Sequence, residues 1–190
     1  MTDAIKPIQL PQITFPGKIH FICNDQELQS IISELNSATV LGFDTETRPS
    51  FKKGEVYKTA LLQLSTDTDA YVVRLQKITK YEFIKSVFEN ENIIKAGAAI
   101  RDDIKQLQKT FSFTPQNFIE IQDMAKKAGL ENFGLKGMAE EILEFSISKG
   151  PKMTNWEANE LTDRQIGYAA TDAWIGFLLY KKLSKKITNQ

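Results

Sequence analysis

The spacing of apolar and polar residues predicts short strands that alternate with helices. Compact apolar runs are typical of buried strands, and the nearly continuous run at 39–43 favours a central strand buried on both faces. The turn residues at 67–69 lie between two such runs and indicate a hairpin. Strands are therefore expected at 19–23, 39–43, 59–65, 70–75, 93–99 and, as a short last strand, 118–121.

Apolar residues recur at helical spacing between and after these runs. The last helix begins with the capping-box pair Thr162 and Gln165, and residues 166–180 are apolar almost all round, which predicts a buried helix. Helices are expected around 28–35, 81–89, 100–111, 135–143 and 162–183. Together the elements predict an α/β fold with a mixed sheet of five or six strands flanked by helices.

The chain length and the prolines predict one domain with a short arm. A chain of 190 residues corresponds to about one domain. Pro7, Pro11 and Pro16 interrupt the first seventeen residues. We therefore expect an extended arm over 1–17 and a single domain over 18–190.

Composition narrows the chemistry to carboxylates. Lys plus Arg and Asp plus Glu are 24 each, so no overall basic field exists and any nucleic-acid contact must be local. The chain has a single histidine, His20, and a single cysteine, Cys23. This composition excludes most histidine-based catalytic triads and a Cys/His zinc site. The lone cysteine favours the reducing cytoplasm, and no apolar run is long enough to span a membrane.

Two acids mark the end of the predicted central strand. The period of two places the side chains of Asp44 and Glu46 on one face of the sheet, where both can bind one cation. The alternative is a pair of acids in a solvated turn. Two acids that end a buried strand favour the cation, because an unpaired buried charge costs several kcal/mol.

Two further segments supply acids to the same predicted region. On the helix after strand 93–99, Asp103 lies at the flank of the apolar stripe, whereas Asp102 faces water; a helix-dipole role is the alternative for Asp103. On the last helix, Tyr168 and Asp172 are four residues apart and share one face. A buried acid there needs a partner, which is either a metal ion or a hydroxyl or basic group from elsewhere.

Four acids from three segments carry about the charge needed to neutralise two divalent cations. Oxygen ligands favour Mg²⁺ or Mn²⁺ over zinc. Two such ions are a known means of activating water in phosphodiester hydrolysis.

Three segments contain these residues: Phe43-Asp44-Thr45-Glu46, Ala96-Gly97 with Asp103 six residues on, and Tyr168-Ala169-Ala170-Thr171-Asp172. They resemble the three motifs of the DEDDy 3′ to 5′ exonucleases, and the chain is similar to ribonuclease D and the Werner-syndrome exonuclease domain. The resemblance implies a ribonuclease H-like fold and release of nucleoside monophosphates from a nucleic-acid 3′ end.

The resemblance also implies a role for each site residue. Asp44, Glu46 and Asp172 would bind one Mg²⁺ or Mn²⁺ ion, and Asp44 would also contact a second ion. Asp103 would hold that second ion through water, and Tyr168 would orient the attacking water.

Substrate contacts are expected in two loops that combine basic and aromatic residues, a mixture that suits single-stranded ends. An ordinary solvated loop is the alternative for the first of them. The candidate residues are Arg48, Lys52, Lys53, Tyr57 and Lys58 in the first loop, and Asn155 and Trp156 in the second.

The sequence thus favours a metal-dependent 3′ to 5′ exonuclease that acts on DNA or RNA with a free 3′ end. One alternative is a catalytically silent module of the same fold that binds nucleic acid or protein. A second alternative is a ribonuclease H-like endonuclease, which would also cut circular substrates.

Overall fold

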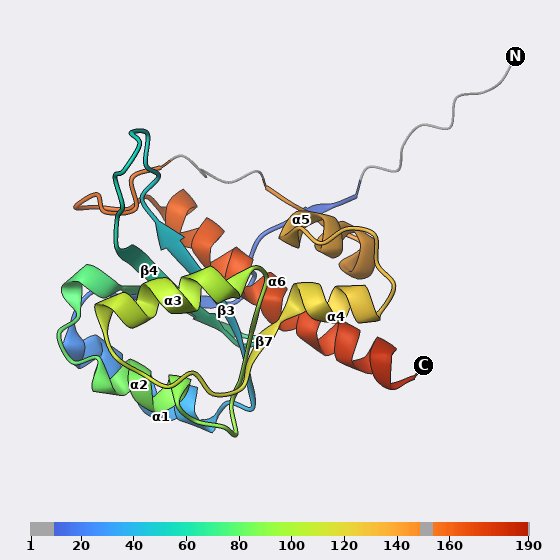
Figure 1. Ribbon diagram of the computed structural model, residues 1–190, viewed down its shortest axis with the longest axis horizontal. Coiled ribbons are helices and arrows are strands. Elements are labelled where there is room, and N and C mark those ends of the chain that lie inside the picture. Colours follow the sequence, from blue (N-terminus) through green and yellow to red (C-terminus); the bar gives the residue numbers. More distant parts are fainter. Residues whose placement is uncertain (1–9, 149–153, 190) are drawn as a thin grey trace, which may run out of the picture.

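A six-stranded sheet forms the centre of the molecule and confirms the mixed α/β fold (Figure 1). The computed structural model describes residues 10–148 and 154–189. The strands lie in the order β2-β5-β4-β3-β6-β7, so the predicted central strand, β3, is in the interior of the sheet. Their bounds are β2 Lys18–Ile22, β3 Val40–Thr47, β4 Thr59–Ser65, β5 Asp69–Arg74, β6 Ile94–Gly97 and β7 Phe118–Glu120.

The direction of neighbouring strands changes across the sheet. Strand β4 runs antiparallel to both of its neighbours, β3 and β5. The pairing of β4 with β5 confirms the predicted hairpin. Strand β2 runs parallel to β5, and β6 and β7 extend the sheet parallel to β3. Parallel neighbours need crossover connections, and the helices in these connections all pack on one face of the sheet.

Two hydrophobic cores lie on opposite faces of the sheet. Helices α1, α2 and α3 pack on one face around a group of aromatic rings that includes Phe43 and Phe88. Helices α4, α5 and α6 and the turn η2 pack on the other face. The bounds are α1 Asp25–Ser37, η1 Leu75–Lys77, α2 Glu82–Phe88, α3 Ile100–Thr110, α4 Ile121–Lys127, α5 Leu135–Met138, η2 Ala139–Leu143 and α6 Asp163–Thr188.

Helix α6 packs directly on the backbone of β3 and β6. A Cβ atom at Gly42 would lie 1.9 Å from the carbonyl oxygen of Ala173, and one at Gly176 would lie 2.8 Å from that of Ala96. The absence of side chains at these two glycines therefore lets the middle of α6 cross β3 at contact distance. The predicted capping box starts this helix. None of the described helices, α6 included, combines the length and apolar character required to cross a membrane.

Several element boundaries differ from the prediction. Strand β3 continues to Thr47 rather than ending at 43, because its last residues still pair with β4. Strand β6 ends at Gly97, before the chain turns at Ala99 with φ +62°. The helix expected at 135–143 is α-helical to Met138 and continues as the π-helical turn η2.

Part of the predicted arm packs on the domain. Strand β1 (Gln12–Ile13) pairs in parallel with β8 (Ser146–Ile147), and Phe15 is buried with its ring edge-on to Trp174. Residues 1–9 lie outside the described part of the chain. The division into an arm over 1–17 and a domain over 18–190 stays a prediction.

Candidate active site

Three predicted acids converge where α6 crosses β3. Carboxylate oxygens of Asp44, Glu46 and Asp172 all lie within 4.8 Å of one another. The period of two along β3 points the first two acids toward α6, and the close packing at Gly42 brings Asp172 down to them. Residues more than 120 positions apart thus form one acidic group.

The electrostatics of this group fit a bound cation. Burial raises the pKa of Asp44 well above its usual value, and the charges of Asp172, Glu46 and Asp103 raise it further. Closely spaced carboxylates that are withdrawn from water either bind protons or share a cation. A set of oxygen donors suits a divalent metal ion, so the donor chemistry and the spacing both fit such an ion.

The fourth predicted acid lies near this group but outside it. Asp103, on α3, accepts a hydrogen bond of 2.7 Å from Thr45 Oγ1, on the residue between the two β3 acids. Burial raises the pKa of the Asp103 carboxyl, with smaller effects from Asp102 and Glu120, while the Thr45 bond lowers it. The side chain of Asp102 is 89% exposed, which confirms that the helix turns this residue toward water.

Glu120 fixes the turn that carries Asp103. This buried carboxylate at the end of β7 accepts hydrogen bonds from the backbone N–H groups of Ala99, at 2.8 Å, and Ile100, at 2.9 Å. It therefore caps α3 from a distant segment, because Ala99 has no side chain that could do so. Sequence analysis missed Glu120, since no local pattern reports a cap that lies 20 residues away.

Tyr168 adjoins the acidic group. Burial, the charge of Asp172 and a hydrogen bond with Asp172 all raise the pKa of the phenol above its ordinary value. The hydroxyl therefore stays protonated at neutral pH. Its ring stacks on Trp156, with ring centroids 6.3 Å apart and planes 24° apart.

A cavity of about 510 Å³ opens onto these side chains. Asp44, Tyr168 and Asp172 line it together with residues from the β6–α3 turn, from α4 and α5, and from the end of β8. Lys136 is the basic residue among those that line it, and its ammonium lies 3.5 Å from Glu140. Sequence analysis also missed Lys136, because nothing local distinguishes it from the other lysines. The lining residues are Asp44, Ala98, Ala99, Gln122, Gly134, Leu135, Lys136, Ile147, Ser148, Tyr168 and Asp172.

The predicted substrate contacts lie outside this cavity lining. In the β3–β4 loop, the guanidinium of Arg48 lies 3.4 Å from Glu157 and 4.6 Å from the centre of the Tyr57 ring. Lys52, Lys53 and Lys58 are exposed in the same loop. This loop also exposes Phe51 and Val56, and such a mixture suits contacts with bases.

The second candidate loop differs from the first. Trp156 is only 1% exposed, so its ring is not presented to solvent, whereas the adjacent Asn155 is exposed. The roles of both residues in substrate binding stay predictions.

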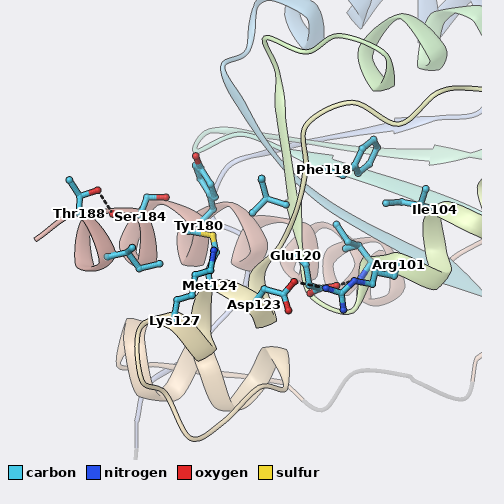
Figure 2. Close-up of a pocket in the computed structure, with 13 residues that line it drawn as sticks. Arg101, Ile104, Phe118, Glu120, Asp123, Met124, Lys127, Tyr180, Ser184 and Thr188 are labelled. Atoms are coloured by element: carbon cyan, nitrogen blue, oxygen red, sulfur yellow. Dashed lines mark hydrogen bonds and ion pairs between the residues drawn. The ribbon is translucent and has the colours of Figure 1, made fainter. Parts of the chain in front are cut away.

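A second cavity lies at the other end of α6, and none of Asp44, Glu46 and Asp172 lines it (Figure 2). It has a volume of about 610 Å³ and lies among α3, β7, α4 and the C-terminal half of α6. An ion pair between Arg101 and Asp123 lies at its edge, and Tyr180 and Met124 are among its apolar walls. It shares no lining residue with the first cavity, so the candidate chemistry belongs to the first one.

A family model described as a 3′-5′ exonuclease matches residues 19–188. The chain belongs to this 3′-5′ exonuclease family. The predicted resemblance and the ribonuclease H-like fold are therefore confirmed.

Individual relatives agree with this assignment. The chain is 30% identical over 184 residues to the mouse bifunctional 3′-5′ exonuclease/ATP-dependent helicase WRN, covering 92% of this chain and 13% of that protein. The crystal structure of Escherichia coli ribonuclease D superposes with a TM-score of 0.83 at 25% identity, covering 90% of this chain and 45% of that one. The Nibbler exonuclease domain of Aedes aegypti gives a TM-score of 0.84 at 21% identity, covering 93% of both chains, and shows the shared fold. The chain spans about half the length, or less, of the curated relatives it matches first.

Proposed function

We propose that this protein is a metal-dependent 3′ to 5′ exonuclease that hydrolyses phosphodiester bonds at nucleic-acid 3′ ends and releases nucleoside monophosphates. The observation that carries the proposal is the acidic group of Asp44, Glu46 and Asp172, two of whose members, Asp44 and Asp172, line a cavity together with Tyr168. Membership of the 3′-5′ exonuclease family supports a catalytic role for this group.

Two divalent cations, Mg²⁺ or Mn²⁺, complete the proposed site. Asp44, Glu46 and Asp172 would bind one ion. Asp44 would also bind the second ion, and Asp103 would contact that second ion through a water molecule. When bound, such ions polarise the phosphate and stabilise the leaving oxygen in an in-line displacement. The raised pKa of Asp44 supports this assignment, because bound cations would relieve the repulsion that produces it.

The side chains of the protein orient the reactants. The Tyr168 hydroxyl is protonated at neutral pH and hydrogen-bonded with Asp172, so it acts as a fixed polar group that orients the attacking water. It does not act as a base, because its pKa is raised rather than lowered. Apolar side chains in the cavity, such as Leu135 and Ile147, provide surfaces against a base or a sugar.

The proposed substrate is DNA or RNA with a free 3′ end. Lys136 supplies a positive charge in the cavity that holds the acids, where it can bind a phosphate of the strand. The exposed lysines of the β3–β4 loop would bind phosphates further along the strand. With equal numbers of acidic and basic residues, we expect few phosphate contacts and a shallow dependence on salt. We assign the activity to the reducing cytoplasm, because Cys23 is the only cysteine.

The test uses linear DNA and RNA labelled at the 5′ end, together with circular DNA, in the presence of Mg²⁺ or Mn²⁺. We expect a ladder that shortens by single nucleotides from the 3′ end, intact circles, and no ladder from Asp172→Asn. Asp102→Asn is the matched control, because Asp102 is an exposed acid on α3, and its ladder should be unchanged.

Three outcomes would overturn the proposal. A ladder that persists in Asp172→Asn would show that the acidic group is not the active site. Cut circles would identify an endonuclease. Binding of the strand with no cleavage under any metal condition would indicate a catalytically silent module.

A further inference from the structure

The loop before α6 is tied to the sheet by a buried arginine. Arg74, at the end of β5, is 5% exposed, and its guanidinium donates hydrogen bonds to the carbonyl oxygens of Ala158 and Asn159, the latter at 2.6 Å. In Figure 1 this loop, in orange, lies beside the teal β3–β4 loop. A planar guanidinium that bonds two successive carbonyls fixes both the position and the direction of the loop backbone.

Glu157 adds a second set of ties in the same loop. Its carboxylate accepts a hydrogen bond of 2.9 Å from Gln76 Nε2 and lies 3.4 Å from the guanidinium of Arg48. At the start of the loop, Gln165 Nε2 of α6 donates to Thr154 Oγ1 at 2.8 Å. The loop is thus bonded to β5, to η1, to the β3–β4 loop and to α6.

Trp156 lies between these ties and packs under Tyr168. The indole is 1% exposed and stacks on the phenol ring at a centroid distance of 6.3 Å. Its N–H has no hydrogen-bond partner among the described residues, so packing holds the ring in place. An aromatic ring that packs in this way acts as a support, whereas a base-stacking ring would need to face solvent.

We propose that Trp156 is a positioning residue that holds Tyr168 in its working orientation, and that the loop at 154–161, tied by Arg74, holds Trp156. This inference rests on the proposed function of Tyr168. The hydrogen bond with Asp172 fixes one point of the phenol but leaves the tilt of the ring free. Contact with the indole face removes that freedom, and small misplacements of an orienting group are costly in catalysis.

The proposal separates two roles for Trp156 that kinetics can distinguish. A residue that contacts substrate changes KM, whereas a residue that acts through Tyr168 lowers kcat and leaves KM unchanged. Binding of Mn²⁺ should also be unchanged, because the three clustered acids lie on β3 and α6 rather than on the loop.

The experiment is a double-mutant cycle on the full chain with Trp156→Leu, Tyr168→Phe and both together. We expect Trp156→Leu to lower kcat about 10- to 100-fold with KM and the Mn²⁺ affinity from calorimetry unchanged. In the Tyr168→Phe background the same substitution should cause no further loss of kcat. Trp174→Leu is the matched control, because it removes a buried indole of the same size whose ring partners are Phe15 and Phe145 rather than Tyr168, and it should keep kcat.

Two more conservative substitutions still test the proposal if Trp156→Leu fails to fold. Trp156→Phe loses no hydrogen bond and keeps a ring, so it should recover most of the kcat. Arg74→Lys can bond only one carbonyl at a time in good geometry, and it should lower kcat in the wild-type background but not in Tyr168→Phe.

The possible failures are distinguishable. If Tyr168→Phe alone keeps full kcat, the proposed role of the phenol is wrong. If Tyr168→Phe is impaired and Trp156→Leu lowers kcat equally in both backgrounds, or raises KM, the positioning role is wrong while the exonuclease assignment stands.

Discussion

Removing one charge from the acidic group should stabilise the metal-free protein. In Asp44→Asn the side chain keeps its shape but no longer repels Glu46 and Asp172. For two unit charges at the widest spacing of 4.8 Å, the repulsion is about 3.5 kcal/mol at an effective dielectric constant of roughly 20. The wild-type site relieves part of this repulsion by binding a proton, as the raised pKa of Asp44 indicates. We therefore expect a net gain of about 1–2 kcal/mol, which corresponds to roughly 2–8 °C in Tm for a domain of this size.

Divalent metal should reverse the order of the two proteins. At 100 times its Kd, Mn²⁺ stabilises the folded state by about 2.7 kcal/mol, or roughly 5–11 °C, and Asp44→Asn should lose most of that shift. The assay is thermal unfolding of both proteins in EDTA and in a series of Mn²⁺ concentrations. Asp102→Asn serves as the control and should behave as wild type in both conditions, because its side chain is exposed and outside the acidic group.

Two results would refute this reasoning. A lower Tm for Asp44→Asn than for wild type in EDTA would show that the three acids do not repel one another in the folded state. An unchanged Mn²⁺ shift in Asp44→Asn would show that the metal binds elsewhere.

Three further substitutions test other parts of the structure. Lys136→Ala should raise KM several-fold with kcat unchanged and reduce the salt slope on single strands by about 0.7, measured as initial rates across a salt series. Glu120→Ala leaves two backbone N–H groups of the α3 turn without their acceptor, so urea unfolding should show a loss of about 2–4 kcal/mol, and kcat should fall because the turn carries Asp103. Burial lowers the pKa of Lys95 from 10.5 to about 8, so the unfolded state binds more protons between those values and stability rises with pH there. Lys95→Met should remove this rise, so between pH 7 and 11 the free energy of unfolding of the wild type should increase by about 3 kcal/mol more than that of the variant. The same pH dependence in both proteins would contradict the lowered pKa of Lys95.

Much of the fold could be predicted from the sequence because the governing interactions are local. The hairpin of β4 and β5 follows from two apolar runs around a turn, and the capping box at Thr162 sets the start of α6 by contacts within one turn. Strand β3 extends beyond its predicted end at 43, because pairing with β4, a non-local interaction, carries the strand through Asp44 and Glu46.

Part of the candidate site could be predicted for the same reason. The period of two puts Asp44 and Glu46 on one face, and the helical period puts Tyr168 beside Asp172. The substrate residues were harder, because exposure depends on packing. The composition of its loop favoured Trp156 as a surface contact, yet Arg74 and Glu157 hold the loop so that the ring is buried.

The sequence by itself determined which residues share a strand face or a helix face, since side-chain direction follows from backbone periods over a few residues. Only the tertiary structure decided which of these faces meet. The contact of Asp172 with the β3 acids depends on backbone approach at Gly42, the support of Tyr168 depends on a loop tied by Arg74, and the turn before Asp103 depends on a cap from β7. These contacts join residues far apart in the chain, and they form only when both faces of the sheet are packed.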